Sequence, residues 1–145
     1  MLSSEMDPEL MRRRVAEARV GRLATVTPEA RPHLVPVCFV LAEDDLYWAV
    51  DQKPKASRDL ARLRNLAVNA LAELLVDSYE EDWTRLWWVR AACTTTVLES
   101  GPEAERALDL LAAKYPQYRA RRPAGPVVRM RVLRWSGWSG EGIDL

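Results

Sequence analysis

The chain has 145 residues, a length that fits one folded domain with one hydrophobic core, and we expect residues 1–145 to form that domain. Its 21 lysines and arginines balance its 21 aspartates and glutamates, so the basic excess typical of nucleic-acid-binding proteins is absent. The longest nearly unbroken apolar run, LVPVCFVL, is far shorter than the roughly twenty residues that span a bilayer, and no secretory signal pattern is present, which predicts a cytoplasmic protein that binds no membrane.

The residues that most often bind metals are few. The chain has two cysteines, Cys38 and Cys93, and one histidine, His33. A structural zinc site takes about four such ligands, so we expect no metal centre. Cys38 lies in an apolar run and is predicted to be a small core residue, so reduced thiols are favoured over a disulfide.

The first predicted helix covers residues 8–19. Asp7 is a suitable N-cap, and Pro8 suits the first helical position, where a missing N–H costs little. Gly21 is predicted to end the helix in a left-handed conformation. One face of the helix is apolar and carries Leu10, Met11, Val15 and Ala18.

Three strands are predicted next, over residues 23–27, 34–41 and 46–50, with a turn at Asp44-Asp45 before the third. The second strand, LVPVCFVL, is apolar on both faces, which is typical of a strand buried on both sides. Pro36 lacks an N–H group and predicts an interruption or a free edge in this strand.

The second half of the chain contains two further helices and three strands. A polar connection over residues 51–58 leads into a helix over 57–65, followed by strands over 71–77 and 86–98. A helix begins at Pro102 and ends at Pro116, and the final strand covers 127–135. The close spacing of six strands predicts a mainly β, α+β fold: an antiparallel sheet closed into a small barrel, with helices at its sides. A doubly wound parallel sheet is disfavoured because no glycine-rich turn follows a strand.

The segment DQKPKASR gathers cations at the start of a predicted helix. Lys53, Lys55 and Arg58 have the wrong sign for the helix dipole, which favours anions at its N-terminus. A phosphate group among these cations and the free N–H groups would offset that cost. A solvated basic loop is the alternative interpretation.

Acid–base or nucleophilic machinery is not evident, and no catalytic residue is predicted. With one histidine, a Ser-His-Asp or Cys-His arrangement could form only around His33, and a surface position for His33 is favoured. The acidic run Glu80, Glu81 and Asp82 is interpreted as a solvated turn before a strand.

Two adjacent tryptophans, Trp87 and Trp88, lie in the strand predicted over residues 86–98. Neighbouring side chains in a strand point to opposite faces, so these indoles are expected to contact different surfaces. They belong to a larger aromatic set that includes Tyr47, Trp48, Tyr79, Trp83, Trp135 and Trp138. Such residues can fill a core or a subunit interface, or border a planar phosphorylated cofactor, and the pattern leaves both interpretations open.

Most of the chain resembles the split β-barrel flavin and deazaflavin oxidoreductases, the superfamily of pyridoxamine 5′-phosphate oxidase. The likeness is carried by GRLATVTPEARPHLVPVCFVL, LYWAVDQKPK, LARLRNLAVN, LLVDSYEEDWTRLWWVRA and RWSGWSG. DQKPK and DWTRLWWVR are similar to segments of an actinobacterial subgroup of coenzyme F420-dependent enzymes, whereas GRLATV is shared more widely. The chain departs from the subgroup at Asn69-Ala70, where Asn-Pro is usual, and at Ala92-Cys93, where a Gly-containing turn is usual.

The resemblance implies a homodimer with two cofactor sites at its interface. The strand from His33 to Cys38 would lie along the cofactor ring and offer backbone groups to it, which makes His33, Leu34, Val35, Pro36 and Val37 candidate binding residues. The next strand and the basic turn would hold the ribityl chain and phosphate through Trp48, Ala49, Val50, Lys53, Lys55 and Ser57.

The resemblance also assigns cofactor contacts to later aromatic residues. The partner subunit would contribute the strand from Trp87 to Arg90. One of Trp87 and Trp88 would pack at the dimer seam while the other borders the partner's cofactor, and Trp88 is included among the candidates. The C-terminal segment from Trp135 to Trp138 would close the site, and Trp135 is included among the candidates.

The implied activity is transfer of a hydride from reduced coenzyme F420 to a small unsaturated organic substrate, with the completing proton taken from solvent. One alternative keeps the fold but uses FMN as an oxidase or reductase. Another is a cofactor-binding or carrier protein without turnover. A third is a structural dimer module whose tryptophans only pack.

Overall fold

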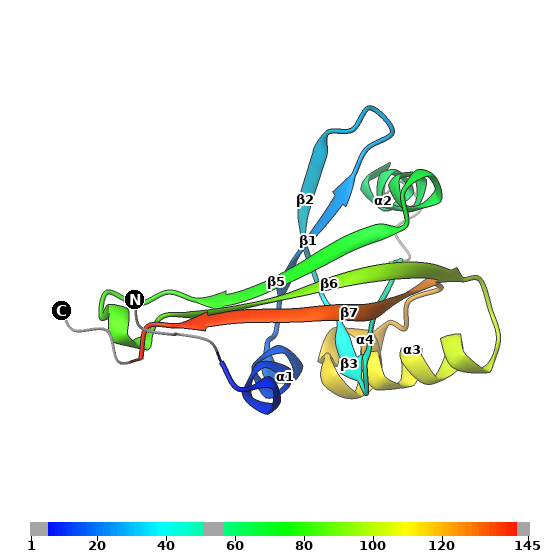
Figure 1. The fold of residues 1–145 in the computed structure, drawn as a ribbon. Helices are drawn as coiled ribbons and strands as arrows, with labels where there is room; N and C mark the ends of the chain where they lie inside the picture. Colours follow the sequence, from blue (N-terminus) through cyan, green and yellow to red (C-terminus); the bar gives the residue numbers. More distant parts are fainter. Residues whose placement is uncertain (1–5, 51–56, 142–145) are drawn as a thin grey trace.

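The computed structural model describes residues 6–50 and 57–141. In this part of the chain, seven strands form one sheet in the order β2-β1-β5-β6-β7-β4-β3, and all neighbouring pairs are antiparallel. The sheet is strongly curled and has helices at its sides (Figure 1). The predicted antiparallel split barrel with flanking helices is confirmed, with seven strands in place of six.

The elements follow the predicted order closely. The strands are β1 (Gly21–Val26), β2 (Pro32–Val37), β3 (Val40–Ala42), β4 (Asp45–Ala49), β5 (Leu71–Ser78), β6 (Trp87–Leu98) and β7 (Val127–Ser139). The helices are α1 (Pro8–Glu17), α2 (Ser57–Val68), α3 (Pro102–Lys114) and α4 (Pro116–Ala120), with a short 3-10 helix, η1 (Trp83–Arg85). None of the described helices is long and apolar enough to cross a lipid bilayer.

The additional strand comes from the run LVPVCFVL. Its first part lies in β2 at one end of the strand order and its last part in β3 at the other end, so the chain crosses between the sheet ends at Cys38 and Phe39. Within the described sheet β2 pairs only with β1, which confirms the free edge predicted from Pro36. The prediction of one strand buried on both sides is wrong: Leu34 is 67% exposed, because one face of this edge strand is not covered.

Helix boundaries reflect caps and close packing. The Asp7 carboxylate accepts hydrogen bonds from the backbone N–H groups of Glu9 and Leu10, so the predicted N-cap is confirmed. The predicted left-handed role of Gly21 is wrong. Gly21 begins β1, and a Cβ atom there would lie 2.6 Å from Leu74 Cδ1, so the absence of a side chain permits close packing. Pro116 ends α3 as predicted, but it also begins α4.

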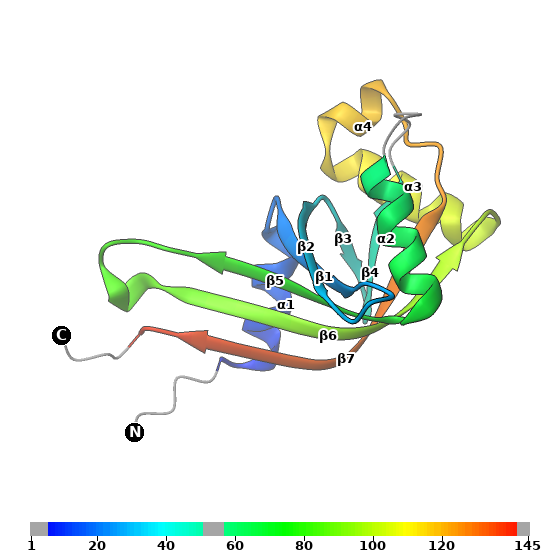
Figure 2. The same ribbon diagram turned by 90° about the horizontal axis from the view of Figure 1, so that it is seen from above.

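Strands β5, β6 and β7 continue past the curled body as a three-stranded arm, formed by residues 76–78, 87–91 and 135–139 (Figure 2). α1 packs across the inner face of this arm. The approach is close, since a Cβ atom on Gly137 would lie 2.9 Å from Met11 Sδ. β7 therefore runs beyond its predicted end at residue 135, because pairing with the full length of β6 and the cover from α1 support it.

The core has two parts that lie on opposite faces of the sheet. The inner cluster includes Leu23, Trp48, Leu74, Val89 and Met130, and α1 and α2 contribute to it. The second cluster lies beneath α3 and includes Val40, Tyr47, Leu108 and Leu111. The remaining outer surface, called the open face below, carries Pro32, Leu34, Pro36, Arg22, Ala24, Leu71, Glu73, Leu75, Asp77, Trp88, Arg90, Ala92, Arg134, Ser136 and Trp138.

Candidate functional site

The candidates from His33 to Val37 all lie in the edge strand β2, where their side chains alternate between two environments. Leu34 and Pro36 are exposed on the open face, whereas His33, Val35 and Val37 face inward. Because β2 has one strand partner, its second edge presents backbone N–H and C=O groups that no other strand of the described sheet pairs with. A planar ligand with hydrogen-bonding groups on its rim can bind along such an edge.

His33 contributes an unusual polar atom on the inner side of β2. It lies opposite Thr25 of β1. Its Nδ1 atom is buried and has no hydrogen-bond partner among the described residues. Buried polar atoms almost always have a partner, so this nitrogen is suited to bond with a group held against β2. The interpretation of His33 as an ordinary surface residue does not match this half-buried position.

The three candidates in and after β4 are engaged within the chain. Trp48 is 1% exposed, and its indole N–H lies 3.2 Å from Met130 Sδ, so its side chain belongs to the inner core. Ala49 packs in the cluster beneath α3. The Val50 N–H donates to the Pro126 carbonyl at 2.9 Å. These residues fix where the chain enters the basic segment, and their side chains offer little surface to a ligand.

The basic segment itself lies outside the described residues. Lys53 and Lys55 fall within 51–56, so their predicted phosphate contacts remain predictions. Ser57 is the first residue of α2, which places a helix N-terminus directly after the two lysines. The free N–H groups and the dipole at such a terminus favour an anion.

A buried polar pair holds α2 against the strand next to β2. Asn65 of α2 donates through Nδ2 to the hydroxyl of Thr25 on β1 at 3.1 Å, and both residues are 3% exposed. Two buried polar groups that satisfy each other fix one relative position of helix and strand. This pair links the helix that follows the basic segment to the strand that carries β2. The sequence analysis did not identify it, because no local pattern relates residues 25 and 65.

The two adjacent tryptophans do serve different faces. Trp87 packs against the inner core, with the Arg14 guanidinium of α1 4.7 Å from its ring centroid. Trp88 lies on the open face, directly opposite Trp138 of β7. The candidate Trp135 pairs with Ala91 and packs against the inner core, so Trp88 and Trp135 point to opposite faces. Trp138, at the end of the segment expected to close the site, is the aromatic neighbour of Trp88.

An irregularity in the sheet determines which C-terminal tryptophan joins Trp88. Ala92 pairs with Arg134 but Cys93 pairs with Val132, so Leu133 is an extra residue in β7. One extra residue reverses which side chains point inward along the strand. The shift lies at Ala92-Cys93, where the sequence departs from its similar subgroup.

Charges on the open face are arranged in pairs around the same aromatic residues. The Arg90 guanidinium lies 5.2 Å from the Trp88 ring centroid and 3.5 Å from Glu73. Arg22 approaches Asp77 at 4.0 Å. Such partly exposed pairs contribute little to stability, but they can orient a second molecule that covers this face.

The acidic run before β6 is a turn, as predicted. The Asp82 carboxylate accepts hydrogen bonds from the Thr84 hydroxyl at 2.6 Å and the Thr84 N–H at 3.1 Å, which lowers the pKa of Asp82. Glu80 pairs with Arg85 at 3.3 Å. Asp82 therefore caps η1, and this cluster is structural.

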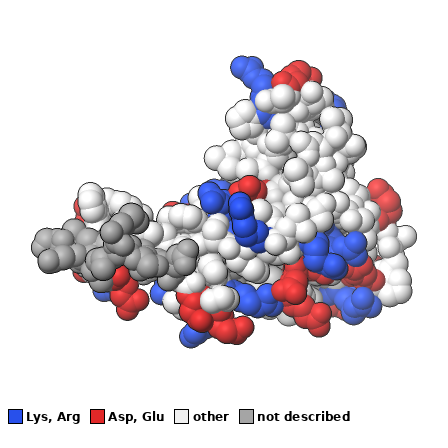
Figure 3. Space-filling view, in the orientation of Figure 1, with Lys and Arg blue, Asp and Glu red and all other residues white. Residues whose placement is uncertain are grey.

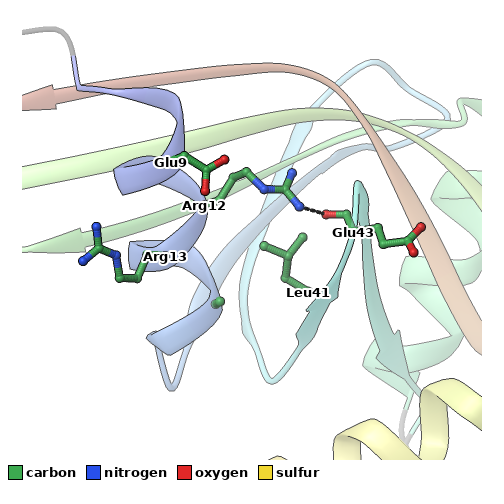
Figure 4. Close-up of a pocket in the computed structure, with 6 residues that line it drawn as sticks. Glu9, Arg12, Arg13, Leu41 and Glu43 are labelled. Atoms are coloured by element: carbon green, nitrogen blue, oxygen red, sulfur yellow. Dashed lines mark hydrogen bonds between the residues drawn. The ribbon is translucent and has the colours of Figure 1, made fainter.

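A cleft beside α1 is lined by none of the described candidate residues. It has a volume of about 440 Å³ and is lined by Glu9, Arg12, Arg13, Ala16, Leu41 and Glu43 (Figure 4). Arg12 crosses it and donates to the Glu43 carbonyl and the Asp44 carboxylate, so its charge ties α1 to the β3–β4 turn. In the described ranges, no three histidine, cysteine or acidic side chains gather closely enough to hold a metal ion.

Groups that could contact a planar ring and a phosphate lie along β2 and at the start of α2. The unpaired edge of β2 and the buried Nδ1 of His33 supply hydrogen-bonding groups. The N-terminus of α2 follows the lysine-containing segment and suits a phosphate. A family model described as pyridoxamine 5′-phosphate oxidase matches residues 7–139.

The chain belongs to the pyridoxamine 5′-phosphate oxidase family. The match covers both ends of the curled sheet, the arm and all described helices. The family resemblance stated from the sequence is thereby confirmed at this level. A search among curated proteins finds no match.

Solved structures with the same fold include proteins described in different ways. A conserved hypothetical protein from Mycobacterium tuberculosis has a TM-score of 0.81 at 17% identity, covering 100% of this chain and 92% of that one. An FAD-binding protein from Mesorhizobium loti has a TM-score of 0.69 at 18% identity, with 94% and 96% covered. HutZ, the heme storage protein from Vibrio cholerae, has a TM-score of 0.69 at 17% identity, with 93% and 97% covered. At these identities the likeness shows the fold of this family member.

Proposed function

We propose that this protein is an oxidoreductase that uses reduced coenzyme F420 to transfer a hydride to a small unsaturated organic substrate. The coenzyme supplies the hydride chemistry when bound, and the chain positions the ring and excludes competing reactions. Membership of the pyridoxamine 5′-phosphate oxidase family and the similarity of DQKPK and DWTRLWWVR to F420-dependent enzymes support the proposal.

The observation that carries the proposal is the unpaired edge of β2. Its backbone groups face away from β1, and a strand edge recognises a flat heterocycle through hydrogen bonds that require no particular side chain. The chain then runs through β3 and β4 into the basic segment that precedes α2. Ring and phosphate contacts therefore come from consecutive parts of the chain, and Lys53 and Lys55 would hold the phosphate.

A homodimer is part of the proposal, and the apolar content of the open face supports it. Leu34 is 67% exposed and Leu71 is 57% exposed. Charged side chains in Figure 3 gather along α1 and α3, whereas the part over β1 and β2 carries few of them. Exposed apolar surface of this kind typically marks an interface. A second copy is the proposed partner, since one surface can then cover itself by two-fold symmetry.

The dimer also explains the position of Trp88. Within one chain β1 and β5 lie between β2 and β6, so Trp88 is not a neighbour of the β2 edge. Because Trp87 packs under α1, Trp88 and Trp138 are the indoles on the open face that can border the partner's cofactor. We therefore assign the border of the partner's site to Trp88, with Trp138 beside it.

The printed descriptions of the structural neighbours favour two alternatives. The FAD-binding protein from Mesorhizobium loti supports a flavin in place of F420, so an FMN-dependent oxidase or reductase is the second candidate. A flavin- or F420-binding protein without turnover is compatible with the same site. HutZ is described as a heme storage protein, so haem belongs in the test as a third ligand.

The test is a side-by-side equilibrium titration of purified apoprotein with F420, FMN and haem, followed by fluorescence or absorbance. Tight binding of F420 with weak binding of FMN is the expected result, and turnover of reduced F420 against a panel of unsaturated substrates would establish the enzyme. Preference for FMN would replace the proposal by its flavin alternative. Binding of haem alone, or of none of the three at micromolar concentration, would refute it.

A further inference from the structure

The crossover between β2 and β3 is held by side chains that the proposed function does not use. β2 ends at Val37 and β3 begins at Val40, so the chain passes between the two ends of the sheet through Cys38 and Phe39. Phe39 is 1% exposed, and its backbone groups lie outside both strands. Buried backbone groups require partners, and here they come from the end of α3.

The Tyr115 hydroxyl lies within hydrogen-bonding distance of both backbone groups of Phe39. It accepts the Phe39 N–H at 3.0 Å and lies 3.0 Å from the Phe39 carbonyl oxygen and 3.1 Å from the Arg19 carbonyl oxygen. Tyr115 is 6% exposed, and burial raises its pKa, so the hydroxyl keeps its proton. The hydroxyl has a single proton, so it can donate to the Phe39 carbonyl or to the Arg19 carbonyl, but not to both at once.

Lys114 completes the arrangement. Its Nζ atom donates to the Phe39 carbonyl oxygen at 2.8 Å and lies 4.1 Å from the Phe39 ring centroid. With that oxygen satisfied, the Tyr115 proton is available to the Arg19 carbonyl. Arg19 in turn donates to the Lys114 carbonyl at 2.8 Å. Three segments are thus tied together: the residues after α1, the crossover, and the end of α3.

We call this cluster the latch; it is formed by Arg19, Phe39, Lys114 and Tyr115. Keeping the Lys114 charge in it costs free energy, which a contact that served only to stabilise the fold would not require. Burial, and then the neighbouring Arg19 cation, lower the pKa of Lys114 to about 8, whereas the Cys38 thiol acts in the opposite direction. A partly buried ammonium beside a guanidinium is less favourable than an apolar side chain would be. The neutral amine still carries N–H groups, so the bond to Phe39 does not require the charge. The benefit of the arrangement is a fixed backbone position at Phe39.

We propose that Lys114 and Tyr115 are positioning residues that fix the end of β2 and, through it, the ring of the bound cofactor. Phe39 follows the last residue of β2 by two positions, so movement at the crossover changes the direction of the edge that carries His33–Val37. The inference rests on the proposed function, because it assumes that the ring binds along β2. It gives a functional reason for the polar, partly charged cluster at the crossover between β2 and β3.

The experiment compares Tyr115→Phe with Tyr47→Phe as a matched control. Both tyrosines are buried, at 6% and 7% exposed. Tyr47 pairs with Val40, the residue after the crossover, but its hydroxyl donates to Glu103 of α3 at 2.7 Å and makes no hydrogen bond to Phe39. Hydrogen–deuterium exchange of the apoprotein reports on residues 33–40. Titration with F420 and FMN reports affinity and the absorption spectrum of the bound ring.

We expect Tyr115→Phe to speed exchange in residues 33–40 about tenfold, the effect of losing one net hydrogen bond, and to weaken cofactor binding by a similar factor with a shifted absorption band. Tyr47→Phe should leave the exchange of this segment, the affinity and the spectrum unchanged. Lys114→Met should act in the same direction as Tyr115→Phe, because it removes the other bond to Phe39.

Two failures can be told apart. If the unsubstituted protein binds F420 in preference to FMN but Tyr115→Phe and Tyr47→Phe give the same exchange, affinity and spectrum, the positioning role is refuted and the proposed function stands. Faster exchange without a change in affinity or spectrum would also refute it, since the latch would then be structural only. If the unsubstituted protein binds neither F420 nor FMN, the proposed function falls, and the positioning of a cofactor falls with it.

Discussion

The buried pair of Thr25 and Asn65 allows a quantitative test of how α2 is held against the sheet. Thr25→Val keeps the shape of the side chain but removes the hydroxyl, and Asn65→Leu removes the amide at similar volume. Each residue is 3% exposed and their polar atoms are 3.1 Å apart, so either single substitution leaves a buried polar group without its partner. Such a loss costs about 1–3 kcal/mol of unfolding free energy.

The double variant distinguishes this hydrogen bond from general packing. Replacing both polar groups removes the unsatisfied partner, so the combined loss should be smaller than the sum of the single losses by about 1 kcal/mol or more. Urea unfolding at one fixed protein concentration gives the three values, with the m-value as a check that unfolding remains comparable. Additivity within about 0.5 kcal/mol would refute the reasoning, because independent sites behave that way.

Three further predictions concern the proposed phosphate site, the proposed homodimer and the N-terminal end of α3. Lys55→Ala should weaken cofactor binding by about 1.5–3 kcal/mol through loss of one charge-assisted bond, measured by fluorescence titration; an unchanged dissociation constant would remove Lys55 from the site. Leu34→Asp should weaken the proposed dimer by at least about 1.5–3 kcal/mol per copy in sedimentation equilibrium, because each copy would bury Leu34. Leu110→Asp on α3, 43% exposed, is the control and should leave the dimer unchanged. Glu103→Ala should cost about 1.5–3 kcal/mol of unfolding free energy, because Glu103 accepts from the Tyr47 hydroxyl at 2.7 Å and from Arg129 at 2.9 Å.

The Glu103 contribution also has a predictable pH dependence. The Tyr47 hydroxyl and then the Arg129 guanidinium lower the pKa of Glu103 below its ordinary value of 4.5. The contribution is therefore fully present above about pH 4.5 and is lost as the pH falls through the lower pKa of the folded state. The stability difference from Glu103→Ala should shrink in that range, and a difference that stays constant down to pH 3 would contradict this assignment.

Local sequence signals were sufficient for most elements and for the family. Asp7 and Pro8 specify the start of α1, Asp82 was correctly placed in a turn, and the alternation of Val128, Met130 and Val132 with arginines specified β7. These features depend on residues a few positions apart, where caps and side-chain alternation act. The segments that carried the resemblance span most of residues 7–139, the range that the family model matches.

Contacts between distant segments decided what the sequence left open. One apolar run became two strands because sheet closure divides it at Phe39, and the Tyr115 and Lys114 groups that hold this point are 75 residues or more away. Trp138 rather than Trp135 lies beside Trp88 because the shift at Leu133 reverses the alternation along β7. The sequence by itself determined most elements, the fold class and the family. Tertiary structure decided the faces, since strand register and barrel closure are properties of pairing between segments and not of any one segment.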